Sequence, residues 1–406
     1  MKKISFIHAA DLHLDSPMVG LKHLPQNIFS RVKESTFTAI KKVTAAAIQH
    51  QVDFVILAGD LFDGEDRSLR AQSRFRTEML KLAEKEIPVY VVHGNHDHLN
   101  GSWVHLDMPS NVHVFTSEVE TKVLHTQNGV SIHLYGFSYP TQHVYDRKIV
   151  DYQKKDGADF HIGILHGNES TGVEHDNYAP FSVNELQKKE FDYWALGHIH
   201  KRAVLSETPP IVYPGNIQGR HKKETGRKGI YHVTLTELDY KMDFLETADI
   251  IWEEIVVDAS SANNFLEVLQ LCQTTINNAR REQTGTLLSL FLKNLDLEDA
   301  RVQRSVKGEL LEILLEDEKG EDSFVWVVDL TITEGQQIDK EILKKDANFY
   351  AELFETIDHY DDVDHALSSL YNHPLGRKYI EHLPIEEQKE LVMKAEKLLI
   401  ELLYQS

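Results

Sequence analysis

The chain has 406 residues, of which 41% are hydrophobic and 26% are charged. This composition excludes a mostly disordered protein, and the length is enough for two or three domains, each with its own core. The formal net charge of -21 argues against a protein that holds nucleic acid by bulk electrostatics, because such proteins are usually basic over the binding face.

Cysteine usage and hydropathy indicate the cellular setting. Cys272 is the single cysteine, so neither an internal disulfide nor a cysteine metal cluster is available. No run of about 18 apolar residues occurs, and the short apolar segment at residues 4–7 lacks the features of a signal peptide. We therefore expect a soluble, cytoplasmic protein that does not enter a membrane.

Up to about residue 255, short β-branched and aromatic runs alternate with amphipathic stretches. Two amphipathic stretches, residues 29–50 and 68–85, predict helices between the first three runs. This alternation predicts an α/β architecture with layered sheets. The runs that read as buried strands are residues 4–7, 53–58, 89–92, 131–137, 161–165, 193–196 and 230–235.

After about residue 252 the pattern predicts a small α/β module and then a helical region. The module consists of a strand at 254–257, a helix at 263–280, and strands at 287–292, 310–315 and 324–333, the last two joined by a turn at Lys319-Gly320. From residue 338 onward the pattern is helical. We therefore predict three parts, at residues 1–255, 256–335 and 336–406.

The last predicted helix, residues 385–404, carries an apolar stripe. Leu391, Ala395, Leu398 and Leu402 lie on one face of it. The more common role of such a stripe is packing within its own domain, and the alternative is docking to a partner. The sequence leaves both interpretations open.

Five short motifs each follow a strand-like run. Taken singly, motifs of this kind are solvated turns more often than ligand pairs, but five in order at strand ends favour a functional site. Strand ends hold ligands rigidly while pointing them into loops that a substrate can reach. The motifs are Asp11-Leu12-His13, Gly59-Asp60-Leu61-Phe62-Asp63, Gly94-Asn95-His96-Asp97, Leu165-His166-Gly167 and Gly197-His198-Ile199-His200.

The side chains of these motifs indicate a metal centre. They supply oxygen donors and imidazoles without thiolates, which suits Mn²⁺, Fe²⁺ or Zn²⁺ in a catalytic site better than a structural zinc. Two metals about 3.5 to 4 Å apart need a bridging carboxylate, and Asp60 is the natural bridge. His8, His93 and His161 fall inside strand-like runs and read as structural imidazoles, while Asp97 either supports a ligand or closes its turn.

The order D-x-H, G-D-x-x-D, G-N-H-D, H-G, G-H-x-H resembles that of the calcineurin-like metallophosphoesterases. Residues 191–229 (FDYWALGHIHKRAVLSETPPIVYPGNIQGRHKKETGRKG) resemble the DNA-repair exonuclease branch of SbcD-like and YhaO-like proteins. This finer match depends on the elements around Tyr213, Glu224 and Lys228. Asn216 departs from the branch, where Ser is common, and this affects a detail of substrate contact rather than the metals.

The resemblance implies a two-sheet β-sandwich flanked by helices, followed by a smaller α/β capping domain and a helical C-terminal tail. It also implies that Asp60 is shared by two metals. The first would be bound by Asp11, His13, Asp60 and His200, and the second by Asp60, Asn95, His166 and His198. Manganese is the first expectation, with iron or zinc as alternatives.

The resemblance gives His96 a separate role. It implies that His96 lies beside the scissile phosphate as a proton donor or a stabiliser of the transition state, and that the carboxylate of Asp63 orients it. The metals would lower the pKa of a bridging water and hold the phosphate oxygens.

Two basic groups could contact nucleic acid. The first follows the last ligand motif and comprises Arg220, Lys222, Lys223, Arg227 and Lys228. The second, Arg67, Arg70 and Arg74, shares a helical face after Asp63. For both groups solvated surface charge is the alternative reading.

Together these observations predict a metal-dependent phosphodiesterase that hydrolyses DNA. The resemblance further implies a homodimer and an SbcC-like coiled-coil ABC ATPase as partner. An enzyme for small-molecule or cyclic-nucleotide diesters on the same scaffold is the main alternative, because a fold does not fix its substrate. A scaffold protein with a degenerate site is disfavoured, because every expected ligand is present.

Overall fold

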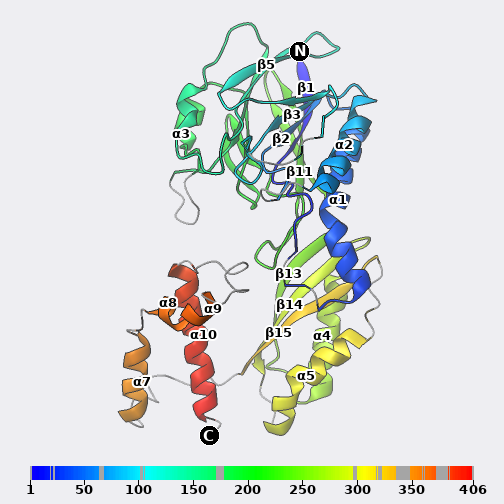
Figure 1. Ribbon diagram of the computed structural model, residues 1–406. Coiled ribbons are helices and arrows are strands. Elements are labelled where there is room, and N and C mark those ends of the chain that lie inside the picture. The colour runs from blue at the N-terminus through cyan, green and yellow to red at the C-terminus, as the bar shows by residue number, and fades with distance from the viewer. Residues whose placement is uncertain are drawn as a thin grey trace. The chain divides into compact units, whose positions relative to one another are not determined.

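The computed structural model describes residues 2–404, except for 19, 22, 64–67, 101–103, 105, 171–177, 296–299, 317, 319–321, 335–347, 359, 361, 372–382 and 384. The chain divides into two compact units, Met1–Thr333 and Glu334–Ser406. Figure 1 shows their elements.

Two six-stranded sheets form the main part of the first unit. The first has the order β12 (Tyr240–Glu246), β11 (Gly229–Thr236), β1 (Lys3–Ala9), β2 (Phe54–Ala58), β3 (Val89–Val92) and β4 (Val112–Val114). The second has the order β5 (Glu120–His125), β6 (Ser131–Gly136), β7 (Phe160–His166), β8 (Tyr193–Gly197), β10 (Pro210–Tyr213) and β9 (Ala203–Glu207). The strands from β1 to β4 are parallel, as are β6, β7, β8 and β10.

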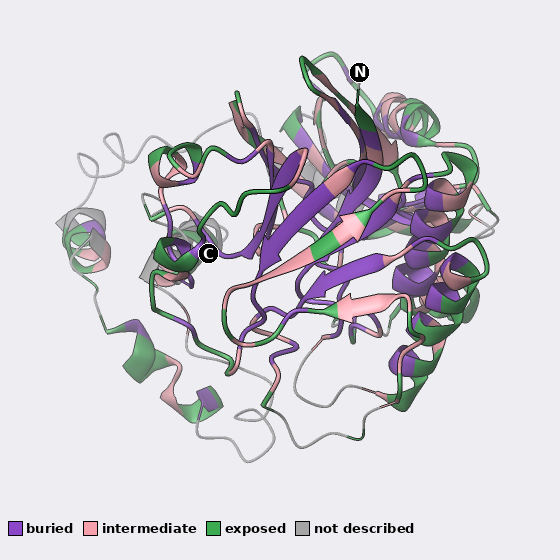
Figure 2. Cartoon of the chain, turned by 90° about the horizontal axis from the view of Figure 1, so that it is seen from above, coloured by how far each residue is buried: buried purple, intermediate pink, exposed green. Residues whose placement is uncertain are grey.

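Strand periodicity explains how the sheets stack. Successive side chains of a strand point to opposite faces, so each buried strand feeds two cores. In β1, Phe6 belongs to the core between the two sheets, whereas Ile7 belongs to the core under the helices. Residues of the second sheet, such as Ile132 and Ile164, complete the inter-sheet core. Figure 2 shows these buried strands at the centre, with helices beside them.

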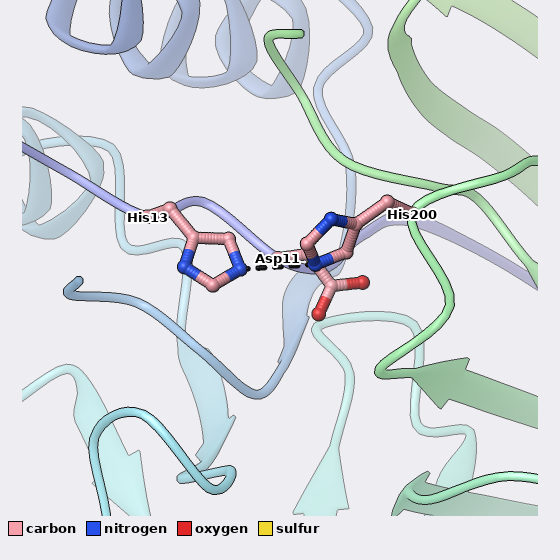
Figure 3. Close-up of side chains that lie close together, drawn as sticks. All are labelled: Asp11, His13 and His200. Carbon is pink, nitrogen blue, oxygen red and sulfur yellow. Dashed lines mark hydrogen bonds between the residues drawn. The ribbon is translucent and has the colours of Figure 1, made fainter. Parts of the chain in front are cut away.

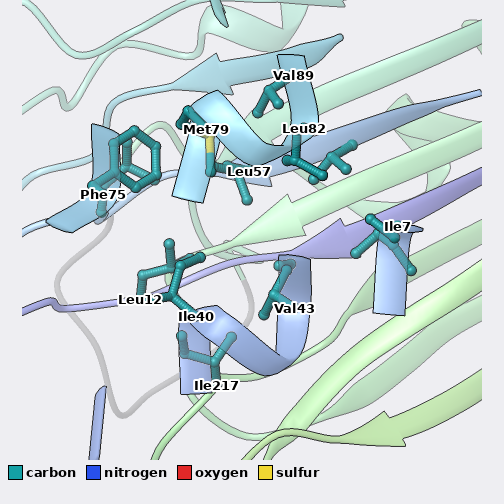
Figure 4. Close-up of a cluster of buried hydrophobic side chains, with 14 of the residues drawn as sticks. Ile7, Leu12, Ile40, Val43, Leu57, Phe75, Met79, Leu82, Val89 and Ile217 are labelled. Atoms are coloured by element: carbon teal, nitrogen blue, oxygen red, sulfur yellow. The ribbon is translucent and has the colours of Figure 1, made fainter. Parts of the chain in front are cut away.

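Helices α1 (Gln26–Gln49) and α2 (Leu69–Ala83) cover the outer face of the first sheet. Ile40 and Val43 of α1 and Met79 and Leu82 of α2 pack against strand residues such as Leu57 (Figure 4). Helix α2 begins after Ser68, whose side chain accepts a hydrogen bond from the Ala71 amide and so caps the helix. The outer face of the second sheet packs on α3 (Val183–Gln187) and the 3-10 helix η1 (Lys148–Asp151).

A third sheet follows, with the order β13 (Ile250–Asp258), β14 (Gly285–Leu295) and β15 (Val325–Glu334). Helices α4 (Phe265–Ala279) and α5 (Ala300–Glu316) cover it. The expected strand at 310–315 is wrong, because these residues lie within α5. Leu310 and Leu314 share one helical face and are buried against this sheet, a period-four pattern that a short apolar run does not distinguish from a strand. The turn expected at Lys319-Gly320 lies outside the described residues.

The second unit is helical in its described residues. It contains α7 (Asn348–Asp358), α8 (Val363–Ala366), α9 (Ser368–Tyr371) and α10 (Ile385–Tyr404), so the helix expected at 385–404 is confirmed. An apolar groove of about 320 Å³ lies among α7, α8 and α10. Met393 and Leu398 of α10 are more than half exposed. Among the described helices of the chain, none has the length and hydropathy that crossing a membrane requires.

The two-sheet α/β core flanked by helices is the fold class that the sequence predicted. Strands β4, β5, β9, β10 and β12 were not anticipated. Four of these five contain exposed or half-exposed residues along most of their length, so their sequences lack the continuous apolar run that marks a buried strand.

Candidate metal centre

The expected ligands all lie at or just beyond strand ends of the two large sheets. Asp11 and His13 follow β1, Asp60 follows β2 and Asn95 follows β3. His166 is the last residue of β7, and His198 and His200 follow β8. Because β1, β2 and β3 are parallel, as are β7 and β8, their carboxyl ends meet along one edge of each sheet. Ligands from five strands therefore converge on one place.

Several of these residues have left-handed backbone conformations, which side-chain-bearing residues rarely adopt. The φ angles are 51° at Asp11, 42° at His13, 51° at Asp60 and 100° at His198. Hydrogen bonds between the two loops hold the first three: the Asp11 amide donates to Gly59 O (3.1 Å) and the His13 amide to Asp60 O (3.0 Å). Such conformations persist only where the surroundings fix them, and they concentrate at functional sites.

Glycines make room for the ligands. A Cβ atom at Gly59 would lie 2.1 Å from His166 Nδ1, and one at Gly94 would lie 2.4 Å from Asp60 Oδ1. Both distances are far below van der Waals contact. Gly59 and Gly94 therefore allow the His166 ring and the Asp60 carboxylate to approach the backbone.

Three groups of side chains have donor atoms close enough together to bind one cation, each within 4.8 Å of the others. The first group, Asp11, His13 and His200, comes from both sheets (Figure 3). The second is Asp11, Asp60 and His166, and the third is His13, Asp60 and His96. Asp60 belongs to two groups, and its Oδ2 lies 3.7 Å from His13 Nε2 and 3.4 Å from His166 Nε2. Asp60, the proposed bridge, thus lies between His13 of one proposed site and His166 of the other.

Carboxylates set the tautomers of two of these imidazoles. His13 Nδ1 donates to Asp63 Oδ1 (3.2 Å), and His200 Nδ1 donates to Glu224 Oε1 (2.6 Å). Burial and the nearby Arg220 guanidinium lower the pKa of His13 to about 3, so its ring is neutral. The Nε2 atoms of the two rings lie 3.1 Å apart. Imidazoles whose other ring nitrogen is held by a carboxylate are typical metal ligands, so the donor set fits a metal ion.

His166 is fully buried among acceptors. Its Nδ1 donates to Ala58 O (2.9 Å), and its Nε2 lies 3.1 Å from Asn95 Oδ1. Burial disfavours a charged ring, but the negative charges of Asp60 and Asp11 raise the pKa of His166 to about 9. The carboxylates therefore favour positive charge here, which a proton or a metal ion can supply.

His198 closes the second side of the site. Its amide donates to Asp11 Oδ1 (3.0 Å), and its ring lies edge-on to the His166 ring with centroids 5.2 Å apart. All seven expected ligands are thus within one cluster. Their assignment to two separate ions remains a prediction.

Asp63 contacts both His96 and His13, so its role in orienting His96 stays a prediction. Asp63 Oδ1 lies 3.2 Å from His13 Nδ1 and 2.9 Å from Arg220 Nη1, but 3.7 Å from His96 Nδ1. Asp63 therefore bonds to a candidate metal ligand and an arginine more closely than to His96. The His96 amide donates to Asp60 Oδ1 (3.0 Å), and 38% of the His96 side chain is exposed, so a substrate can reach it.

Asp97 closes its turn, which is one of the two roles that the sequence left open. Its Oδ1 accepts from the Gly94 amide (2.7 Å), which closes the turn, and its Oδ2 accepts from the Leu61 amide (2.9 Å), which ties this turn to the Asp60 loop. Oδ2 also lies 2.8 Å from His93 Nδ1. His8 is a buried structural imidazole, bonded to Tyr193 Oη and Leu196 O, as expected.

The first basic group divides into two kinds. Arg220 and Lys228 are engaged internally: Arg220 bonds to Asp63, and Lys228 Nζ donates to His200 O (3.0 Å). Burial lowers the pKa of Lys228, and the negative charges of Glu224 and Asp11 oppose this shift only in part. Lys222, Lys223 and Arg227 are exposed, and Arg227 pairs with Glu246 (3.0 Å).

The second basic group is also paired within the chain. Arg70 and Arg74 both bond to Glu34 and both lie over the ring of Phe37. Arg70 additionally contacts Asp15 at 3.3 Å. Arg67 lies outside the described residues.

Sequence reasoning did not anticipate the roles of Glu224 and Asn216. Asn216 is fully buried, and its Nδ2 donates to Glu224 Oε2 (2.9 Å), so it supports Glu224 rather than facing a substrate. Burial favours a neutral Glu224, but the bond from His200 and the charge of Arg220 hold its pKa below the ordinary value. Glu224 was part of a quoted motif, and its separation of 24 residues from His200 gave no sign of their contact.

This fold and this cluster define a phosphoester hydrolase of the metal-dependent kind. Residues 4–202 match the calcineurin-like phosphoesterase family. The chain is 41% identical over 396 residues to the uncharacterized metallophosphoesterase YhaO of Bacillus subtilis (strain 168), a match that covers 97% of this chain and 96% of YhaO. The chain belongs to the calcineurin-like phosphoesterase family, and the resemblance drawn from its motifs is confirmed.

More distant relatives are named for DNA repair. The chain is 27% identical over 292 residues to the DNA double-strand break repair protein Mre11 of Methanococcus maripaludis, covering 64% of this chain and 70% of that protein. It is 25% identical over 293 residues to Mre11 of Methanocaldococcus jannaschii, covering 66% and 74%. These matches extend the similarity to proteins named for the repair of DNA double-strand breaks.

Proposed function

We propose that this chain is a metal-dependent phosphodiesterase that hydrolyses DNA, the nuclease subunit of an SbcCD-like repair complex. The single observation that carries the phosphodiesterase assignment is the Asp60 carboxylate, which lies between the imidazoles of His13 and His166 at the meeting point of five strand ends. The DNA assignment is supported by the similarity to proteins named Mre11.

The proposed cofactors are two divalent transition metals, manganese first, with iron or zinc as alternatives. Asp60 would be common to both sites, and the remaining ligands would be Asp11, His13 and His200 for one ion and Asn95, His166 and His198 for the other. Bound together, two such ions supply a nucleophilic hydroxide at neutral pH and neutralise the phosphate oxygens.

The chain's own residues then act on the substrate. His96 is exposed beside Asp60 and is the proposed proton donor to the leaving oxygen. Lys222, Lys223 and Arg227 are the exposed cations from the segment after the last ligand motif, and they are the proposed phosphate contacts. Arg220 and Lys228 are left out of this surface because their charged groups bond inside the site.

Assembly with other chains is part of the same proposal. We propose a cytoplasmic homodimer with an SbcC-like coiled-coil ABC ATPase as partner, which would supply much of the grip on DNA that an acidic chain lacks. The groove of the second unit and the exposed Met393 and Leu398 support partner docking by α10. Binding of a purified ATPase with wild-type protein but not with a Met393→Glu, Leu398→Glu variant is the expected result.

One observation favours a second candidate, a phosphodiesterase for small molecules or cyclic nucleotides. The chain carries a net charge of -21, and two of its five candidate DNA contacts are internally bonded. A small diester would not need the phosphate contacts that Arg220 and Lys228 cannot make while they are bonded inside the site.

The decisive experiment compares substrates on the purified chain with Mn²⁺. Labelled duplex DNA, single-stranded DNA, a cyclic nucleotide and a phosphomonoester are assayed side by side, with bound metal counted by mass spectrometry. A specificity constant for DNA well above that for the cyclic nucleotide supports the proposal. The reverse order would establish the second candidate.

A further inference from the structure

Arg220 joins two carboxylates that hold candidate metal ligands. Its Nη1 lies 2.9 Å from Asp63 Oδ1, and its Nη2 lies 3.9 Å from Glu224 Oε1. Its backbone amide donates to the other oxygen of Glu224 (2.7 Å). Asp63 and Glu224 in turn accept from the Nδ1 atoms of His13 and His200. Arg220 is thus the link between the supports of two imidazoles.

Burial strengthens the electrostatic interactions within this network. The side chains of Arg220, Asp63 and Glu224 are 15%, 14% and 7% exposed, so water screens their charges much less than at the surface. Two carboxylates that contact one guanidinium would repel each other if it were removed. A guanidinium suits the position, because its planar fork can address two acceptors at once, whereas an ammonium is a single point charge.

We propose that Arg220 is a positioning residue for one metal site, acting through Asp63 and Glu224 on His13 and His200, rather than a contact to the DNA backbone. The inference rests on the proposed two-metal function. Its chemical content is specific: Arg220 holds both carboxylates in place, and they keep both Nε2 atoms aimed at the same ion.

The test measures metal binding directly. Mn²⁺ and Zn²⁺ are titrated calorimetrically into metal-free protein, and Co²⁺ absorption reports the coordination geometry. His13→Ala identifies the ion that depends on His13. For Arg220→Ala we expect that same ion to bind about 10- to 100-fold more weakly, the usual effect of losing an outer-sphere partner. The other ion should bind as in wild type, and Arg220→Lys should recover only part of the loss.

A matched control and a second variant keep the test decisive. Arg280→Ala removes another arginine pair, with Glu318 at 2.8 Å, in the third-sheet region, and should leave both affinities unchanged. If Arg220→Ala fails to fold, Glu224→Gln keeps the shape and removes the charge, and it should weaken the same ion. Wild-type affinity for both ions in these variants, with weakened DNA binding alone, would overturn the proposal. A wild-type protein that binds fewer than two metals would instead refute the two-metal function.

A second observation carries an independent inference. An aromatic cluster extends outward from His198: the Tyr178 ring lies edge-on to it, with centroids 5.6 Å apart. His143 stacks on Tyr178 (5.3 Å, 24°) and its Nδ1 lies 2.7 Å from Tyr178 Oη. Tyr145 stacks on His143 with planes only 12° apart, and 65% of Tyr145 is exposed. The exposed Tyr145 ring is therefore linked to a candidate ligand through His143 and Tyr178.

We infer that this cluster binds an unpaired nucleobase of the substrate strand, with the exposed Tyr145 ring as the stacking surface and His143 as its support. Stacking on aromatic side chains tolerates any base, which suits an enzyme without sequence readout. The hydrogen bond to Tyr178 fixes the His143 ring before binding, which lowers the entropic cost of stacking. This inference rests on the proposed action on DNA.

Fluorescence of 2-aminopurine placed at the end of a single-stranded oligonucleotide tests it, since stacking quenches this base. With EDTA present to prevent cleavage, wild type should quench it. Tyr145→Ala should lose the quenching and weaken binding about 5- to 100-fold, the range for loss of one stack. Tyr145→Phe should behave as wild type, because the ring and not the hydroxyl is required. Metal content should not change in either variant.

The outcomes separate the two proposals. Equal quenching and affinity in wild type and Tyr145→Ala would overturn the stacking surface while leaving the nuclease proposal intact. A wild-type protein that neither binds nor cleaves the oligonucleotide would refute both.

Discussion

The Nε2 atoms of His13 and His200 lie 3.1 Å apart, and the Nδ1 of each ring donates to a different carboxylate. The two carboxylates therefore hold both Nε2 atoms in one place, where they can bind one cation together with Asp11. Metal binding at this place is therefore expected to stabilise the fold locally.

Metal stoichiometry is the first prediction. The chain should bind two divalent transition metals, and Asp60→Asn should lower the occupancy of both sites, because Asp60 faces imidazoles of both. His13→Ala should mainly empty one. Mass spectrometry of protein dialysed against Mn²⁺ gives the counts, and a single ion at saturation in wild type would contradict the bridge. Removal of metal with EDTA should lower the melting temperature, since ligands of the folded state stabilise it.

His96 provides the second prediction. If it donates a proton to the leaving oxygen, His96→Ala should lower kcat about 10²- to 10⁴-fold with metal content near wild type. Because His96 also forms a candidate cation group with His13 and Asp60, metal content must be measured on the same sample. Loss of an ion in His96→Ala would show that this histidine is a ligand.

Asp63→Asn serves as the companion variant to His96→Ala. Asp63 bonds more closely to His13 than to His96, so its loss should lower metal affinity as well as turnover. The two variants should therefore be separable by metal titration. A variant of Asp63 with unchanged metal affinity would return it to the role of orienting His96.

The third prediction concerns the exposed cations Lys222, Lys223 and Arg227. Replacing all three with alanine should weaken DNA binding and reduce the slope of log K against log salt concentration by up to about 3, roughly one per phosphate contact. Hydrolysis of a small diester should change little. The control replaces three exposed lysines elsewhere, Lys188, Lys241 and Lys293, and should leave the slope unchanged. Equal losses of DNA affinity in both triple variants would mean that net charge, and not direct phosphate contact, causes the effect.

Cys272 gives the fourth prediction, which concerns stability. Its side chain is fully buried among Val268, Ile276 and Leu290, and burial raises the pKa of the thiol to about 12. The reactive thiolate is therefore scarce at pH 8. A thiol reagent should label the folded protein very slowly and the urea-unfolded protein completely. Rapid labelling without urea would show that α4 opens readily from the third sheet.

The sequence predicts those elements of the fold that carry a clear hydrophobic period. Buried parallel strands such as 89–92 and amphipathic helices such as α1 carry their own periodicity, so both were identified before any contact was known. Strands half-exposed to solvent, such as β5, lack that pattern. Residues 310–315 show the limit: a short apolar run fits a strand or a helical face, and packing against the third sheet decided for the helix.

At the site, the sequence determined the donor atoms and their order, because D-x-H, G-N-H-D and G-H-x-H are local and each follows an apolar strand. Only the tertiary structure decided which residues form hydrogen bonds with these donor side chains. The partners of His13 and His200 are Asp63 and Glu224, which are 50 and 24 residues away from them along the chain. Arg220 reaches Asp63 across 157 residues, so in the sequence it looked like one more cation for DNA. Contacts at such separations depend on how two sheets stack, and periodicity along the chain does not record that.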